Sequence, residues 1–540
     1  MREFLTSLSY NSWILPALLI LPLLGVAAIY LVPNARNADG NGQGAIDAPG
    51  AARLIALITF IAEFALSVGL WWSFEPGASG WQAVVDKGWI SEWGARFTVG
   101  IDGISLFMVL LTTLIMPLSV LGSWTSVRSK VRGYYALLLV LTTGMIGVFV
   151  ALDLLLFYVM WEVMLVPMYF IIGIWGGERR IYASLKFFIY TMVGSLLMLV
   201  AILYLWTATG SSTFNYDQIL AAAAFSRESG ITVFGTFLPA SLLLFGAFFL
   251  AFAVKVPMFP FHTWLPDAHV EAPTAGSVIL AAIMLKMGTY GFLRFAMPLF
   301  PDAAMTPWVR TTILVLAVIG IVYGALVAMV QPDFKKLIAY SSVSHLGFVM
   351  LGIFALTVQS VQGSLMVMIN HGISTGALFL LVGMVYERRH SRMIDSYGGI
   401  ARVMPMFAVF LTIVSLSSIG LPGTNGFIGE FLVLLGSFPV SPYLTVIAAT
   451  GVIFAAAYLL WAIQRILFNP LDKAENKRLP DLNRREVLIM GVLTVLIVWL
   501  GVYPAPVLRR MEISANRFVE TVERGATAAP APRPVSLEER

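Results

Sequence analysis

The sequence predicts an all-α polytopic membrane protein with about 14 transmembrane helices. Hydrophobic residues make up 59% of the chain and charged residues 12%, whereas soluble globular proteins average about 45–50% and about 25%. Apolar stretches recur at about 20 residues, the length that a helix needs to cross a bilayer. Prolines and glycines interrupt two of these stretches, which predicts helices that are broken at membrane depth.

Apolar segments of spanning length follow one another along the chain. The first spans are expected at about Trp13–Val32, Leu54–Trp72, Ile104–Leu121, Tyr135–Ala151, Leu154–Ile174, Phe187–Trp206 and Ala240–Val256. The others follow at about Thr274–Phe300, Trp308–Val330, Leu337–Leu356, Gly363–Tyr386, Met404–Leu435, Tyr443–Phe468 and Val487–Tyr503. We interpret the first as a retained helix rather than a cleaved signal, because it is long enough to span.

The distribution of Lys and Arg predicts the orientation. These residues concentrate in the odd-numbered connections, so the positive-inside rule puts those loops in the cytoplasm and both termini on the periplasmic side of a bacterial inner membrane. The basic tail after Leu508 argues weakly for the opposite orientation. Its prolines, Pro530, Pro532 and Pro534, predict a disordered end.

Several kinds of chemistry are excluded. The chain has no cysteine, so it cannot ligate an iron–sulfur cluster through thiolates or form disulfides. It has no phosphate-binding Walker loop and no dinucleotide fingerprint, and we interpret the glycine-rich stretch 40–44 as a loop. The net charge of +5 does not indicate nucleic acid, because the basic residues flank the membrane spans. We therefore expect no cofactor on this chain.

Ionisable residues inside the predicted spans are the candidate functional residues. A charge at mid-membrane costs about 2.5–3.5 kcal/mol on insertion scales, so it needs a partner, water or a function. The candidates are Glu63, Glu162, Lys255, Lys286, His345, His371 and Glu430. Each has a structural alternative: the carboxyls could bond to a neighbouring helix, Lys255 could extend to the interface, and a lone histidine is usually a packing residue.

Two helix breaks organise these residues. Lys255 precedes Pro257, Pro260 and Pro266, each of which removes a backbone donor. Pro422 and the glycines around it precede Glu430. The interrupted spans are the seventh and the twelfth, which predicts two inverted five-helix repeats with a site at each break. The expected domains are 1–133 with the first three helices, 134–300 and 301–468 as the two halves, and 469–540 with the last helix and a polar tail.

The histidines lie among small polar residues. Ser341, Ser342 and Ser344 precede His345, and Asn370 precedes His371, so the segments could form a polar track that relays protons. His262 and His269, with Asp267 and Glu271, could bind a metal, but a polar loop is the favoured interpretation. An amine and a carboxylate together also form a switch, because a nearby carboxylate stabilises the protonated amine. Moving Glu162 relative to Lys255 would load or unload a proton.

The same stretches resemble the antiporter-like subunits of respiratory complex I, most closely the subunit M branch and its mitochondrial counterpart, chain 4. The resemblance covers roughly 102–467. Its most specific parts begin at Asp102 (DGISL), Trp161 (WEVMLVPM), Ile174 (IWGG), Lys255 (KVPMFPFHTWLPDAH), Glu271 (EAPTAGS), Leu285 (LKMGTYG), Asp333 (DFKKLIAYSS) and Gly420 (GLPGTNGFIGE).

The resemblance implies roles for individual residues. Glu162 and Lys255 would be the coupling pair, Lys286 the central relay and Glu430 the outer terminal group. A glutamate at this last position is similar to subunit M, whereas related subunits tend to carry lysine. Asp153 resembles a family acidic position near the membrane face, and His262 is a further candidate. The loop 34–50 and the tail after Leu508 lie outside the resemblance.

Three classes of function compete. The leading one is a proton-translocating subunit among other membrane subunits of complex I, in a lipid bilayer, with NADH and quinone chemistry on other chains. The second is a subunit of a multi-chain Na⁺/H⁺ antiporter or a membrane-bound hydrogenase. The third is a structural spacer that conducts nothing. The buried Lys286 argues against the spacer, because inert packing has no use for so costly a group.

Overall fold

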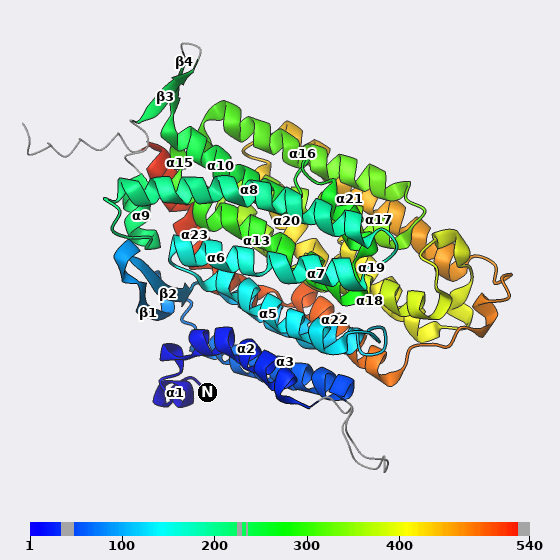
Figure 1. The fold of residues 1–540 in the computed structure, drawn as a ribbon. Coiled ribbons are helices and arrows are strands. Elements are labelled where there is room, and N and C mark those ends of the chain that lie inside the picture. The colour runs from blue at the N-terminus through cyan, green and yellow to red at the C-terminus, as the bar shows by residue number, and fades with distance from the viewer. Residues whose placement is uncertain (34–47, 224–228, 234–235, 528–540) are drawn as a thin grey trace, which may run out of the picture.

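The computed structural model describes residues 1–33, 48–223, 229–233 and 236–527. It is a bundle of long helices that run roughly parallel or antiparallel to one another (Figure 1). Within the described residues, 12 helices are long and apolar enough to cross a membrane, and three shorter apolar helices accompany them. The protein is therefore a multi-pass membrane protein. The three shorter helices fall in the seventh and twelfth predicted spans, and the total of about 14 stays a prediction.

The N-terminal part comprises short elements and four long helices: α1 (Arg2–Ser7), a 3₁₀ turn (Tyr10–Ser12), α2 (Ile14–Leu31), α3 (Ala48–Ser73), β1 (Gln82–Ile90), a 3₁₀ turn (Ser91–Trp93), β2 (Ala95–Ile101), α4 (Ser105–Gly122) and α5 (Val131–Val150). The chain continues with α6 (Leu154–Val163), α7 (Leu165–Trp175), α8 (Arg180–Ala208), α9 (Tyr216–Ala223), β3 (Gly230–Val233), β4 (Thr236–Pro239), α10 (Ala240–Lys255) and α11 (Trp264–Glu271).

The eighth span is built from α12 (Thr274–Ile279), a π-helix (Leu280–Met284), α13 (Leu285–Gly291), a second π-helix (Phe292–Ala296) and α14 (Met297–Leu299). After α15 (Pro301–Met305) come α16 (Pro307–Met329), α17 (Phe334–Ala355), α18 (Val358–Arg389), 3₁₀ turns at Ile394–Ser396 and Ile400–Arg402, α19 (Pro405–Ile419) and α20 (Asn425–Ser437). The last elements are α21 (Pro442–Ile463), a π-helix (Gln464–Phe468), a 3₁₀ turn (Asn476–Arg478), α22 (Arg484–Val502) and α23 (Ala505–Thr527).

Both predicted helix breaks are confirmed. The first follows Lys255, the last residue of α10, and the chain becomes helical again at Trp264. The second lies between α19 and α20, where Gly420 and Gly423 adopt φ of 84° and 90°. Only glycine adopts these left-handed conformations without strain, so the glycines allow the chain to leave one helix and start the next within five residues.

A third break was not predicted. The segment expected as one helix over Leu154–Ile174 divides at Met164 into α6 and α7. Pro167 explains the division, because it has no N–H to bond the carbonyl of Val163 four residues earlier. Gly144 of α5 faces this point, and a Cβ there would lie 3.0 Å from the Met164 nitrogen. The missing side chain therefore lets α5 approach the break.

The elements outside the spans also differ from the expectation. β1 pairs with β2 and β3 pairs with β4, and each pair is antiparallel. The otherwise helical fold therefore contains two β-hairpins. The tail expected to be polar forms α23 up to Thr527, and the proline-rich end lies outside the described residues. α23 is amphipathic and buries Val507, Met511, Ala515, Phe518, Val519 and Val522. Such a stripe at helical spacing is typical of a helix lying on a surface.

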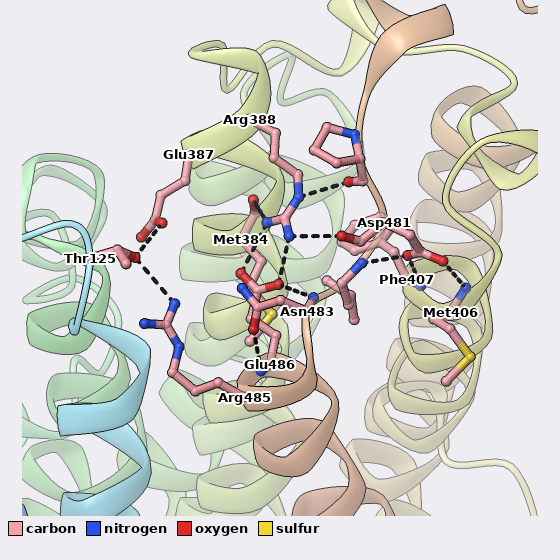
Figure 2. A network of polar contacts seen from close by, with 12 residues as sticks. Thr125, Met384, Glu387, Arg388, Met406, Phe407, Asp481, Asn483, Arg485 and Glu486 are labelled. Atoms are coloured by element: carbon pink, nitrogen blue, oxygen red, sulfur yellow. Dashed lines mark hydrogen bonds and ion pairs between the residues drawn. The ribbon is translucent and has the colours of Figure 1, made fainter.

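The bundle has two ends, which we name by their connections. The even face holds both hairpins and α9, at the left of Figure 1, and the odd face holds the loops after α4, α18 and α21. At the odd face, Arg388 donates two hydrogen bonds to Glu486, of 3.0 and 2.6 Å (Figure 2). It also donates to the carbonyls of Met384, Pro480 and Asp481. The network joins the end of α18 to the start of α22.

The same network caps the N-terminal ends of two helices, α22 and α19. The Asn483 side chain accepts a hydrogen bond from the Glu486 nitrogen, and Glu486 accepts one from the Asn483 nitrogen, which is a capping box. Asp481 accepts from the nitrogens of Met406 and Phe407 in the first turn of α19 (Figure 2). Three helix ends that are distant in sequence are thereby fixed at one place.

We expect Arg388→Ala to lower the free energy of unfolding by about 3–5 kcal/mol, because it leaves a buried carboxylate without its partner. The Arg388 and Glu486 side chains are only 11% and 4% exposed. Thermal or denaturant unfolding of the purified protein in detergent measures the change. Arg524→Ala is the matched control, because Arg524 pairs with Glu520 in an exposed contact and its loss should have little effect. Equal effects of the two substitutions would contradict the stabilising role of the buried Arg388–Glu486 pair.

Candidate functional site

Four of the predicted residues form a row across the centre of the bundle, which we call the buried row. The Nζ atom of Lys286 lies 2.6 Å from Nδ1 of His371. The rings of His371 and His345 face each other edge-on, with centroids 5.7 Å apart. Nδ1 of His345 lies 2.8 Å from Oε1 of Glu430. All four residues are buried, so the row is a line of polar groups inside an apolar protein.

Lys286 owes its position to the irregular helix that carries it. The π-helix Leu280–Met284 ends just before it, and Nζ donates to the carbonyl of Ala281, five residues earlier, at 2.5 Å. A Cβ on Gly288 would lie 2.8 Å from the carbonyl oxygen of Phe252 and from the nitrogen of Val256. Glycine at this position therefore brings the helix of Lys286 against the first break.

The second break supplies the other end of the row. Ser417 and Ser374 both donate to Oδ1 of Asn425, and the Asn370 amide donates to the Asn425 carbonyl. These contacts fix the start of α20 against α18, five residues before Glu430. A Cβ on Gly429 would lie 2.7 Å from the Val367 nitrogen of α18.

A cavity of about 20 Å³ lies between these helices, at the outer end of the row. This volume can hold a water molecule where polar partners are available. The partners are present, because the cavity is lined by His345, Asn370, His371, Ser374, Thr375, Ser417, Ser418 and Glu430, together with Val367 and Gly426.

Glu162 and Lys255 lie apart from the row, on the first half of the fold. The Lys255 ammonium is 3.5 Å from the sulfur of Met164 and lies over the rings of Trp161 and Phe187, at 5.3 and 5.5 Å. Both Glu162 and Lys255 belong to described segments, and no N–O contact within 4.0 Å joins them. Glu162 is half-buried, and its Oε1 has no hydrogen-bond partner within the described residues. Both groups therefore lie near the break at Met164, but they do not form an ion pair with each other.

The histidines and carboxyls considered for a metal do not converge. His269 stacks on Phe379 at 4.5 Å, and His262 stacks on Phe259 at 5.7 Å. Asp267 pairs with Lys186 at 2.7 Å, and the Glu271 carboxylate accepts from the Arg179 nitrogen at 2.9 Å. In the part of the chain that the structure describes, no group of three metal-ligating side chains is present.

Two further candidates lie outside the row. Asp153 is the N-cap of α6 and accepts hydrogen bonds from the nitrogens of Leu156 and Arg96. Burial raises the pKa of this carboxyl. Glu63 is fully buried in α3, and neither carboxyl oxygen has a hydrogen-bond partner among the described residues. The contacts of Asp153 fit a helix cap, and nothing connects Glu63 to the row.

Sequence reasoning missed Lys335, which it placed among the loop charges. Lys335 is 7% exposed, and its Nζ donates to the carbonyl of Ala272 at 2.5 Å. It lies on a cavity of about 690 Å³ at the odd face, whose charged lining includes Arg128, Glu271, Glu387 and Arg392. Lys335 lies two residues before the predicted span Leu337–Leu356 and so looks like a flanking charge, and only the packing of the loops could reveal its burial.

The sequence pattern described as "NADH:quinone oxidoreductase/Mrp antiporter, TM" matches residues 151–455, more than half of the chain and all of the buried row. The chain belongs to this family of membrane proteins. Subunit M of the NADH-quinone oxidoreductase of Rhodobacter capsulatus is 45% identical over 500 residues, which cover 91% of this chain and 93% of the relative. Chain 4 of the NADH-ubiquinone oxidoreductase of Chondrus crispus is 43% identical over 516 residues, 95% and 98% of the two chains.

A solved structure agrees with these relatives. A chain in the respiratory complex I of Thermus thermophilus with bound NADH superposes with a TM-score of 0.81 at 32% identity. The match covers 94% of this chain and 99% of that chain. The resemblance to the antiporter-like subunits, and to subunit M and chain 4 among them, is thereby confirmed.

We expect Gly429→Ala to destabilise the protein by about 1–3 kcal/mol, because the added methyl would meet the backbone of α18 where the helices touch. Gly491→Ala, in a helix position with nothing within 4 Å, is the control and should be neutral or slightly stabilising. Unfolding in detergent measures both. If the two variants unfold alike, close packing of α20 on α18 does not position Glu430.

Proposed function

We propose that this chain conducts protons across the membrane as a subunit of a respiratory NADH:quinone oxidoreductase. Electron transfer from NADH to quinone takes place on other chains, and other membrane subunits of the complex are its neighbours in the bilayer. The observation that carries the proposal is the buried row from Lys286 to Glu430, in which an amine, two imidazoles and a carboxyl meet.

The chemistry of the row suits protons. Each of its four groups can gain or lose a proton, and imidazole does so near neutral pH in its reference state. The contacts at 2.6 and 2.8 Å are hydrogen-bond distances over which a proton can pass. The gap between the two rings and the space beside Glu430 lie next to a polar cavity of water size. The row can therefore work as a relay with water as a further carrier.

Glu162 and Lys255 would couple the relay to the rest of the complex. A buried ammonium is stabilised by a nearby carboxylate and destabilised when the carboxylate moves away. Half-burial leaves Glu162 able to respond to a neighbouring subunit, and its distance from Lys255 leaves room for movement. A change of about three pKa units in such a pair is about 4 kcal/mol, close to the roughly 4.6 kcal/mol needed to move one charge against about 200 mV.

The direction of transfer follows from the charges at the two faces. Lys and Arg concentrate in the odd-numbered connections, which supports a cytoplasmic odd face and periplasmic termini in a bacterial inner membrane. Protons would enter through the cavity that contains Lys335 and reach Lys286 from there. They would leave from Glu430, beyond the break between α19 and α20.

The runner-up function is Na⁺/H⁺ antiport, and the family description also names an Mrp antiporter. The ligands favour protons over sodium. Hard cations are held by oxygen ligands, such as carboxylates and unwound carbonyls. Three of the four groups in the buried row are nitrogen bases, which bind protons well and sodium poorly.

Lys286→Ala should abolish most proton pumping by the assembled complex in vesicles, because it removes the only amine of the buried row. Lys286→Arg should not restore it, since arginine stays protonated and cannot release its proton. The measurement is protons moved per NADH oxidised, with assembly checked on a native gel.

Lys87→Ala is the matched control, because Lys87 lies in the exposed β1–β2 hairpin. Pumping should be unchanged in this variant. A Lys286→Ala complex that pumps at the normal ratio would exclude the buried row as the route.

Glu430→Gln should block transfer while leaving assembly intact, because glutamine keeps the volume and most hydrogen bonding but cannot ionise. Glu430→Asp should retain partial pumping, since a carboxyl remains although its reach is one methylene shorter. Pumping per electron is compared between the two variants. Equal losses would mean that Glu430 acts through packing, and no loss in either would mean that protons leave by another residue.

A further inference from the structure

A second set of polar groups, outside the buried row, follows Lys286 along its own helix. Tyr290 and Arg294 follow Lys286 at intervals of four residues along the same helix, toward the even face. The Tyr290 hydroxyl donates to the Phe149 carbonyl at 2.9 Å and accepts from Nε of Arg294 at 3.2 Å. Oγ of Ser105 lies 3.3 Å from it. Eight residues of helix correspond to about 12 Å, so this line is a short way from Lys286 to the surface.

Arg294 closes the line at its outer end. Its Nη2 lies 2.7 Å from Oδ1 of Asp102, and the guanidinium lies over the Trp81 ring at 4.6 Å. The Arg294 and Asp102 side chains are 8% and 13% exposed. Because Nε points to Tyr290 and Asp102 lies beyond the guanidinium, the pair presents its positive end to Lys286.

The surrounding segments hold this pair in place. The Asp102 carboxylate also accepts from the nitrogens of Ile104 and Ser105, both at 3.0 Å. The next residue, Gly103, donates its N–H to Ser514 of α23 at 2.8 Å. A Cβ on Gly103 would lie 2.2 Å from the Arg510 carbonyl oxygen, so α23 lies directly against the pair. The amphipathic helix therefore covers the end of the line.

A proton relay needs such a closure. Protons delivered to the even face could return along Tyr290 to Lys286 without passing His371, and the transport would be short-circuited. Arginine cannot release its proton at any relevant pH, and its fixed positive charge raises the energy of a proton beside it in a low-dielectric interior. Positive groups exclude protons from membrane pores in the same way.

We propose that Arg294, held by Asp102, is an electrostatic barrier that closes the even-face end of the Lys286 helix to protons. The inference rests on the proposed function, because it assumes that Lys286 is part of a conducting route. It gives a role to an arginine near the end of the predicted span Thr274–Phe300 that was not among the candidate functional residues. It also explains why the buried Arg294–Asp102 ion pair lies between Lys286 and the even face, since protons at Lys286 need only the one route through the buried row.

The test is passive proton leak through the assembled complex in vesicles, without NADH, under an imposed pH gradient. Arg294→Gln should raise the leak roughly tenfold and lower the protons moved per NADH oxidised, while NADH oxidation continues. Adding Lys286→Ala to this variant should remove the leak, because the route starts at Lys286. Arg294→Lys, which keeps the charge, should remain tight.

Arg310→Gln is the matched control. Arg310 is another partly buried arginine near the even face, and it donates to the carbonyls of Phe354 and Ala355 at the end of α17. Its loss should not cause a leak, because it does not lie on the helix of Lys286.

The single variant leaves Asp102 unpaired, so assembly is checked on a native gel. If it does not assemble, Asp102→Asn with Arg294→Gln keeps the size and hydrogen bonding of the pair without either charge, and should leak in the same way. A tight, assembled neutral pair would overturn the barrier. If Lys286→Ala alone stops pumping in that case, the proposed function stands and only the barrier fails. If Lys286→Ala alone pumps normally, the proposed function itself fails.

Discussion

The burial of the Lys286 amine is the constraint on which the rest of the site depends. An amine at mid-membrane is tolerated only where other polar groups or water reach it. Here the π-helix before Lys286 offers the Ala281 carbonyl, and α18 offers the ring of His371. His371 is buried in turn, and it lies against His345, which lies against Glu430. Each group offers a polar contact to the next one and so lowers the free-energy cost of burying it. The row extends in this way until it reaches a broken helix.

Broken helices and close packing make this row possible. A regular helix satisfies its own backbone and offers neighbours only side chains, whereas the break lets α20 begin inside the bundle at Asn425, to which Asn370, Ser374 and Ser417 donate hydrogen bonds. Glycines at 288 and 429 bring helices together beside Lys286 and Glu430. Membrane helices gain little from hydrophobicity on contact, so such small residues determine which helices touch. The cost of charge in the apolar interior also underlies the proposed role of Arg294, whose fixed positive charge would keep protons from passing along Tyr290.

Some parts of the protein could be predicted because they depend on local sequence. The spans follow from runs of apolar residues, and the breaks follow from proline and glycine, whose backbone effects need no tertiary context. The break at Met164 was missed because one proline in an apolar run is often accommodated. The two hairpins were missed because they are short, and α23 was missed because an amphipathic helix lacks the strong signal of an apolar span.

The sequence by itself therefore determined the membrane class, two of the three helix breaks and the identity of most buried ionisable residues, since hydrocarbon penalises charge wherever it occurs. The tertiary structure decided which of these residues meet. Lys286 and His371 are 85 residues apart, as are His345 and Glu430, and Arg294 and Asp102 are 192 apart. No periodicity within a helix relates such positions. Only the packing of α18 against α12, α17 and α20 brings the groups of the row within hydrogen-bond reach, and only the packing of loops and α23 buries Lys335 and Arg294.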